Sequence, residues 1–219
     1  MNKSMIILGA GGHGKVVLSL IQELGIDVLY LTDADESKHG NKVLGVEIVG
    51  GDEMLSEVNP DEVDLAIGLG VGSDGMNLIA QLKRRFMIAQ NLLKRGFAFP
   101  ALIHPNSWIA SDCSIGGGAQ IFAGAVLQPS CSIGEQVIIN TKVSVDHDSS
   151  IGNAVHLAPG VTCGGKVEIG ENSHIGIGAT IFPNIKIGND AVIGAHALVN
   201  SNISKGTKAK GIPAKLEIS

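Results

Sequence analysis

The sequence predicts an α/β Rossmann-like domain over residues 1–97, followed by a parallel β-helix over residues 98–219. Three observations lead to this expectation. An aliphatic residue recurs at every sixth position of the second part, and a glycine-rich loop follows the first expected strand. The composition also combines 30 glycines in 219 residues with only 3% aromatic residues. A chain of this kind turns often around small and β-branched side chains, which argues against a helical bundle.

Charge and composition argue against several other classes of protein. The formal net charge of −5 gives no basic excess, so we expect no nucleic-acid partner. We expect no membrane insertion, because no apolar run approaches the roughly 18 residues that span a bilayer. The three cysteines are odd in number and lack CxxC spacing, which predicts reduced thiols and a cytoplasmic protein.

The first domain opens with a strand, a glycine loop and a helix. Residues 4–8 read as a buried strand, Gly9, Gly11 and Gly14 form the loop, and residues 15–24 read as a helix. A second strand over residues 27–31 leads to Asp33. This order matches the dinucleotide fingerprint, in which glycines let the backbone approach a diphosphate at a helix N-terminus and an acid follows about 20 residues later. The alternative is a tight strand–helix turn with no ligand.

The rest of this domain is expected to alternate strands and helices. We expect strands at 46–49, 63–69 and 97–102, a short helix at 52–57, and a longer helix within 75–95. The second glycine-rich segment, residues 68–72, follows one of these strands and is a candidate second wall of the same crevice.

The second part of the chain is a sequence repeat with a period of six residues. The repeated position is aliphatic throughout, apart from one cysteine: Ile103, Ile109, Ile115, Ile121, Leu127, Ile133, Ile139, Val145, Ile151, Leu157, Cys163, Ile169, Ile175, Ile181, Ile187, Ile193 and Val199. This period suits a parallel β-helix, in which each unit is a short strand with a corner. Three units close one coil, so residue i lies over residue i+18. Cys113 and Cys131 are therefore expected to stack as core residues rather than to form a disulfide.

The candidate reactive centre is His147, which lies between Asp146 and Asp148. A carboxylate bonded to one ring nitrogen sets the tautomer and favours the other nitrogen as a base, and either acid is a candidate for that role. At the same place in the next coil comes Gly165, preceded by Gly164. This coil therefore leaves space for a thioester and offers a backbone N–H to its oxygen. An exposed polar face is the alternative reading of the stretch.

These motifs together resemble the sugar acetyltransferases of the hexapeptide-repeat superfamily, in the group of sialic-acid O-acetyltransferases and UDP-4-amino-sugar N-acetyltransferases. The resemblance extends over essentially the whole chain. It implies a left-handed β-helix, a homotrimer, acetyl-CoA bound between subunits, and a nucleotide sugar held by the first domain. We expect no metal, because no three histidines or acids show ligand spacing.

The resemblance also implies roles for individual residues. The family stretch Asn-x6-His-[Asp/Glu]-x7-His is matched by Asn140, His147, Asp148 and His156. His147 is then the general base and Asp148 its orienting partner, with Asn140 and His156 near the cofactor.

In the first domain the resemblance places the loop against the diphosphate. Gly11, Gly12 and His13 are implied to face it, and Asp33 is implied to lie near the base or ribose.

The predicted function is N-acetylation of a UDP-4-amino-4,6-dideoxy-type sugar, for surface glycan or glycoprotein biosynthesis. Three alternatives stay open: O-acetylation of a sialic acid, a nicotinamide-dependent dehydrogenase, and a β-helix that binds without catalysis. The intact loop and Asp33 favour the nucleotide sugar over sialic acid. The small first domain and the long repeat argue against the dehydrogenase, and His147 beside Asp148 argues against the non-catalytic protein.

Overall fold

A computed structural model describes residues 3–72 and 77–216 of the chain. Within these, residues 3–70 and 85–102 form one compact unit, and the remaining residues form a second. The domain boundary expected after residue 97 stays a prediction.

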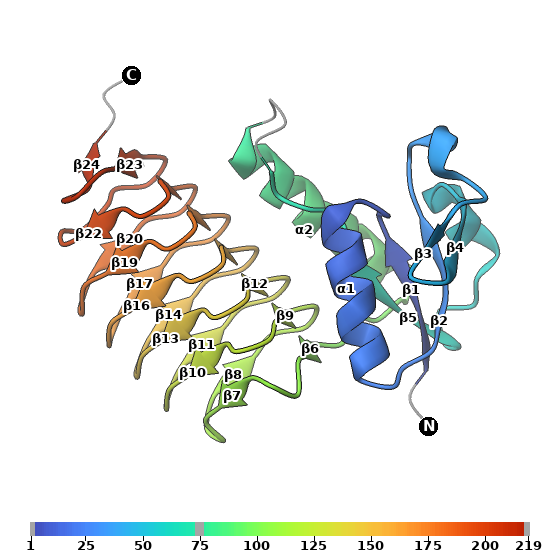
Figure 1. Cartoon of the computed structure of the whole chain (residues 1–219), viewed down its shortest axis with the longest axis horizontal. Helices are drawn as coiled ribbons and strands as arrows, with labels where there is room; N and C mark the ends of the chain where they lie inside the picture. The colour runs from blue at the N-terminus through green and yellow to red at the C-terminus, as the bar shows by residue number, and fades with distance from the viewer. Residues whose placement is uncertain (1–2, 73–76, 217–219) are drawn as a thin grey trace. The chain divides into compact units, whose positions relative to one another are not determined.

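The first unit is built on a five-stranded sheet in the order β3-β4-β2-β1-β5 (Figure 1). The strands are β1 (Ser4–Leu8), β2 (Val28–Thr32), β3 (Lys42–Val43), β4 (Val46–Gly50) and β5 (Val63–Ile67). Its helices are α1 (Gly12–Glu23) and the part of α2 (Leu78–Lys94) from Arg85 onward, with short 3-10 turns at η1 (Glu36–Lys38) and η2 (Asp52–Glu57). β1 runs parallel to both of its neighbours, β2 and β5, as expected for a Rossmann-like sheet.

The core of this unit forms around β1. Ile6 and Leu8 pack with Ala89 and Leu92 of α2, and the intervening Ile7 is also fully buried. A strand that is covered on both faces carries a continuous apolar run, which explains the sequence of residues 5–8. None of the described helices is long and apolar enough to cross a membrane.

Two details of this unit differ from expectation. Strand β3 was not predicted, because so short a strand carries no periodic signal. It pairs antiparallel with β4 through the short Leu44–Gly45 turn. The prediction of a strand over residues 97–102 is wrong for most of its length. Ala98 makes a single bridge to Asp64, and the next strand is β6 (Leu102–Ile103).

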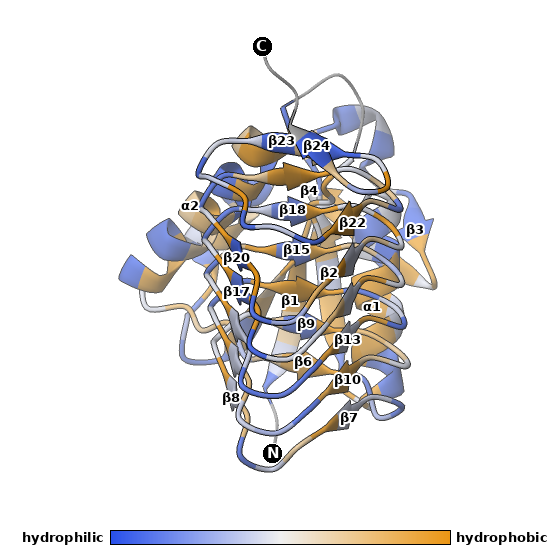
Figure 2. Cartoon of the chain, turned by 90° about the vertical axis from the view of Figure 1, so that its left-hand side faces the viewer, coloured by the Kyte–Doolittle hydropathy of each residue, from blue (hydrophilic) through white to orange (hydrophobic). Residues whose placement is uncertain are grey.

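The second unit is a parallel β-helix, as the six-residue repeat predicts. Its coils stack one above another in Figure 2, each contributing one short strand to each of three sheets. One sheet, named sheet D here, contains β7 (Trp108–Ile109), β10 (Val126–Leu127), β13 (Ser144–Val145), β16 (Thr162–Cys163), β19 (Thr180–Ile181) and β22 (Leu198–Val199).

The other two faces follow the same register up to residue 193. Beyond it, Lys208 pairs with Val192 at a spacing of 16 residues, and residues 215–216 pair antiparallel with residues 209–210. Sheet E contains β8 (Ser114–Ile115), β11 (Ser132–Ile133), β14 (Ser150–Ile151), β17 (Glu168–Ile169) and β20 (Lys186–Ile187). Sheet C contains β6, β9 (Gln120–Ile121), β12 (Ile138–Ile139), β15 (His156–Leu157), β18 (His174–Ile175), β21 (Val192–Ile193), β23 (Lys208–Lys210) and β24 (Lys215–Leu216).

The predicted stacking of residue i over residue i+18 is confirmed. Leu127 pairs with Val145, which pairs with Cys163, and all three inward side chains are at most 1% exposed. Cys113 and Cys131 are free thiols rather than a disulfide. This register fixes which corner residues lie over one another, and it therefore positions the site.

Candidate active site

Packing explains two glycines of the loop after β1. Gly9 has a φ of +104°, in the left-handed region that favours glycine. A Cβ on Gly14 would lie 2.1 Å from the Gly9 carbonyl oxygen, so only a glycine fits at this position in the first turn of α1. Both residues hold the strand–loop–helix turn together.

Packing does not explain Gly11 and Gly12. A Cβ on either residue would meet no atom within 4 Å among the described residues, and neither has a positive φ. Their missing side chains leave the loop backbone open at the N-terminus of α1. A pocket of about 340 Å³ lies here, and its lining includes both glycines together with Lys15 and Lys42. This backbone and these two cations suit an anionic ligand. Neither lysine was predicted from the sequence, although Lys15 directly follows the loop.

His13 and Asp33 lie beside this loop. The Cβ of His13 would be 3.2 Å from a Cβ built on Gly70, so the second glycine segment approaches the first. The Asp33 carboxylate accepts hydrogen bonds from the Ala10 N–H at 2.8 Å and the Lys38 ammonium at 3.1 Å. Burial of the Asp33 carboxyl opposes ionisation, but hydrogen bonds from backbone N–H groups and from Lys38 lower its pKa below the ordinary value. The ionised Asp33 carboxylate therefore stabilises the loop through its hydrogen bond to the Ala10 N–H.

His147 lies at the corner between β13 and β14, where sheet D passes into sheet E. Its Nδ1 lies 2.8 Å from Oδ2 of Asp148, and both side chains are about half exposed. Asp146 instead accepts a 2.8 Å hydrogen bond from the His147 backbone N–H. Asp148 is therefore the acid that contacts the ring. Its φ of +58° lies in the left-handed region, as at other corners of the coils.

The next coil covers the imidazole with bare backbone. A Cβ on Gly165 would lie 2.6 Å from His147 Nε2, so only glycine fits beside the ring in this position. Among residues 3–72 and 77–216, no backbone carbonyl accepts a hydrogen bond from the Gly165 N–H. The neighbouring Gly164 is needed for a different reason, because its Cβ would meet the Pro183 ring at 2.8 Å.

Asn140 and His156 form a second pair. Asn140 Nδ2 lies 3.3 Å from His156 Nε2, and His156 is 7% exposed. His174, one coil further on, contacts His156 edge-on with ring centroids 5.0 Å apart. Burial lowers the pKa of His174 to about 4, so this ring is neutral near neutral pH. The coil register places His174 directly over His156.

The two pairs lie at different corners of one chain. Asn140 follows β12 of sheet C and precedes β13 of sheet D, whereas His147 follows β13. The strand of sheet D therefore separates Asn140 from His147.

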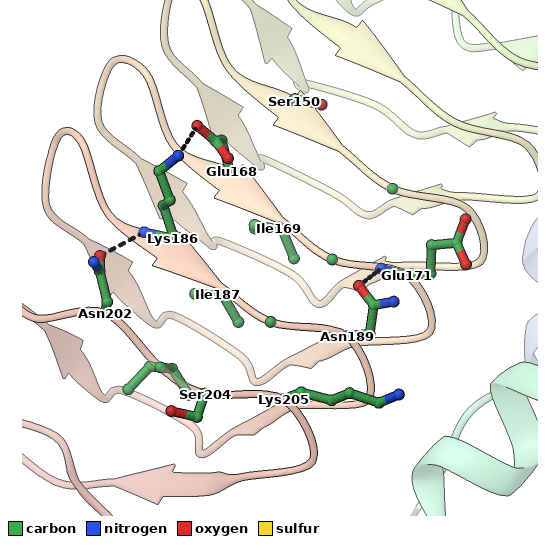
Figure 3. Close-up of a pocket in the computed structure, with 14 residues that line it drawn as sticks. Ser150, Glu168, Ile169, Glu171, Lys186, Ile187, Asn189, Asn202, Ser204 and Lys205 are labelled. Atoms are coloured by element: carbon green, nitrogen blue, oxygen red, sulfur yellow. Dashed lines mark hydrogen bonds and ion pairs between the residues drawn. The ribbon is translucent and has the colours of Figure 1, made fainter.

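Other parts of the β-helix offer less for catalysis. A pocket of about 610 Å³ lies on sheet E, and none of the predicted site residues lines it (Figure 3). Its polar groups bind one another, as in the 2.8 Å ion pair between Glu168 and Lys186. Cys163 points into the core, where burial raises the pKa of its thiol to about 12. Within the described part of the chain, no group of three His, Cys, Asp or Glu residues is placed to hold a metal ion.

Comparisons with known proteins agree with this architecture. Residues 4–75 match the family profile of the PglD N-terminal domain, and residues 166–201 match that of the bacterial transferase hexapeptide in six repeats. The acetyltransferase domain of PglB from Neisseria gonorrhoeae, solved with acetyl coenzyme A, is 32% identical over 99% of this chain and 100% of its own, with a TM-score of 0.89. The chain belongs to the hexapeptide-repeat sugar acetyltransferases.

Two further structures extend the comparison. PerB from Caulobacter crescentus, in complex with CoA and GDP-perosamine, is 32% identical over 98% of this chain and 97% of its own, with a TM-score of 0.86. WeeI from Acinetobacter baumannii shares the fold at 23% identity, with a TM-score of 0.83. A search of curated proteins gave no match. The predicted fold, an α/β domain followed by a left-handed β-helix, and the predicted superfamily are both confirmed.

Proposed function

We propose that this protein is an acetyl-CoA-dependent N-acetyltransferase that acts on the amino group of a nucleotide-activated sugar. The observation that carries the proposal is the His147–Asp148 pair, whose free ring nitrogen faces the bare backbone of Gly165. The solved relatives support the same reaction class. The acetyltransferase domain of PglB was solved with acetyl coenzyme A, and a mutant of the perosamine N-acetyltransferase from Caulobacter crescentus was solved with CoA and GDP-perosamine.

The chemistry follows from the geometry at His147. With Nδ1–H donated to Asp148, Nε2 carries the lone pair and can accept a proton from the attacking amine. The amine nitrogen bonds to the thioester carbonyl carbon as this proton moves to Nε2. The Gly165 N–H donates to the developing oxyanion. The C–S bond then breaks, the imidazolium returns the proton to the thiolate, and the products are the N-acetyl sugar and CoA thiol.

The acceptor is proposed to be held at the loop of the first unit. Gly11 and Gly12 leave room for a diphosphate at the N-terminus of α1, and Lys15 and Lys42 supply positive charge. His13 is proposed to donate to the diphosphate, and Asp33 to lie near the base or ribose. We propose a UDP-4-amino-4,6-dideoxy-type sugar that feeds surface glycan or glycoprotein biosynthesis in the cytoplasm.

A homotrimer is proposed to complete each site. His147 and Asp148 of one copy then meet Asn140 and His156 of the next. Sheet D lies between these corners, and its outward positions carry no charged residue. They are Trp108, Val126, Ser144, Thr162, Thr180 and Leu198. The exposed Trp108 adds apolar surface at one end of this column. Such a face suits contact around a symmetry axis.

The test replaces the proposed base. His147→Asn should lower acetyl transfer to a nucleotide amino sugar by about 100-fold or more, assayed as release of CoA thiol. His196→Asn is the matched control, because His196 is another exposed corner histidine whose ring lies against a glycine. Turnover by His147→Asn at the level of the wild-type protein would contradict the proposal. A panel of UDP-, GDP- and dTDP-linked amino sugars, with free sialic acid included, identifies the acceptor.

A further inference from the structure

Arg85 of α2 buries a charge that no acid neutralises. Its side chain is only 2% exposed, and in residues 3–72 and 77–216 no carboxylate lies within ion-pair distance of it. Burial lowers its pKa to about 9, so the guanidinium stays positive near neutral pH. Its Nη2 has no hydrogen-bond partner among the described residues. Buried charges in proteins are normally paired, so this one calls for a reason.

The guanidinium is anchored where β5 ends. Nη1 donates to the Leu69 carbonyl oxygen and, at 3.3 Å, to the Ile67 carbonyl oxygen. The Leu69 carbonyl shares its peptide group with the Gly70 N–H. A cation bound to the carbonyl polarises that group and makes the N–H a stronger donor. The charge of Arg85 therefore acts on segment 68–70, the glycine-rich stretch after β5.

Segment 68–70 lies against the glycine loop that follows β1. A Cβ on Gly68 would lie 2.4 Å from the Gly9 carbonyl oxygen, and one on Gly70 would lie 3.2 Å from the Cβ of His13. β1 and β5 are adjacent parallel strands. The strand order of the sheet reverses at this point, because β2 and β4 lie on one side of β1 and β5 lies on the other. Ligands of open α/β sheets bind outside the carboxyl ends of the strands at such a point.

We propose that Arg85 is a positioning residue for the anionic part of the nucleotide sugar. Arg85 fixes segment 68–70 against the glycine loop after β1. Its unpaired positive charge also attracts the negative charge of a diphosphate bound at that loop. A charge in a buried, poorly screened position acts over several ångströms without contact. This inference rests on the proposed function, because it takes the loop as the diphosphate site.

The experiment separates the charge of Arg85 from its packing. Purified full-length protein is titrated calorimetrically with UDP, GDP and dTDP, and then with the nucleoside of the diphosphate that binds best. Arg85→Met should weaken diphosphate binding by about tenfold and nucleoside binding by less than about twofold, since only the diphosphate carries charge. Arg85→Lys, which keeps the charge but not the planar fork, should fall between Met and wild type. Arg84→Met removes the same charge from the exposed neighbouring position and should bind as wild type does.

Steady-state kinetics give the second measurement. In Arg85→Met, KM for the nucleotide sugar should rise about tenfold, with kcat and KM for acetyl-CoA nearly unchanged. Equal loss of nucleoside and diphosphate binding, or unchanged diphosphate binding, overturns the inference. Should Arg85→Met fail to fold, Arg85→Gln keeps N–H donors without charge, and the same two titrations decide. Wild-type protein that binds no diphosphate contradicts the proposed function itself, before any Arg85 variant is made, and the inference then falls with it.

Discussion

A Cβ placed on Gly165 would lie 2.6 Å from Nε2 of His147, so the imidazole rests directly on the glycine backbone of the next coil. The regular stacking of the coils creates this relationship, because it aligns the corner of one coil with the same corner of the next. The ring edge that would handle the proton thus faces a surface without side chains. The positions of these two residues are therefore coupled.

Gly165→Ala should inactivate the protein without unfolding it. The added methyl group must displace the imidazole, and a shift of about 1 Å in a catalytic group costs about 100-fold in rate. The corner is exposed, so the ring can move into solvent and the melting temperature should change little. Thiol release and a thermal melt measure the two effects. A kcat within about twofold of wild type would show that the contact has no catalytic importance.

The two acids beside His147 should differ in importance. Asp148 contacts the ring, whereas Asp146 accepts from a backbone N–H, a role that an amide oxygen can also fill. Asp148→Asn should lower kcat by about 100-fold, and Asp146→Asn by less than about threefold. Both variants remove one carboxylate from the same corner, so each serves as the control for the other. The reverse order would assign the orienting role to Asp146.

Gly11 and Gly14 should respond differently to the same added methyl group. Gly14→Ala places a Cβ against the Gly9 carbonyl and should destabilise the fold by about 2 kcal/mol or more. Gly11→Ala meets open space and should leave stability unchanged. If a diphosphate approaches the loop closely, Gly11→Ala should instead raise KM for the nucleotide sugar by about tenfold and leave KM for acetyl-CoA unchanged. Unaltered kinetics in Gly11→Ala would mean that the ligand does not approach the loop at this residue.

The sequence predicts the repeat well and the site in part, for physical reasons. A period of six fixes register along the whole β-helix, so the contact between His147 and Gly165 follows from counting. The choice between Asp146 and Asp148 does not, because it depends on the left-handed φ of Asp148 and on side-chain rotamers. Arg85 carries no sequence signal, since a buried arginine in an amphipathic helix looks like any exposed one.

His174 should make stability depend on pH. Its pKa is about 4 in the folded chain, below the ordinary 6.5, so the unfolded chain binds the extra proton between these values. Stability from this group is therefore full above about pH 6.5 and is lost as the pH falls toward 4, by about 2 kcal/mol for a partly exposed ring. His174→Val copies Val192, the residue paired with it one coil further on, and should flatten this acid loss. Thermal melts of both proteins at pH 7.5 and pH 5 provide the measurement. Equal losses in both proteins would assign the acid sensitivity to other groups.

The proposed trimer, with each site shared between two copies, predicts that two variants complement each other. His147→Asn loses the proposed base, and His156→Ala loses the residue paired with Asn140 at the other corner. Both variants are co-expressed with different tags and purified over both, so that every trimer contains both chains. In a cyclic trimer, one interface then joins an intact His147 to an intact His156, whichever chain is present twice. The activity should be about one third of wild type. If both residues of a site came from one chain, every site would carry a defect and activity would stay near that of the single variants.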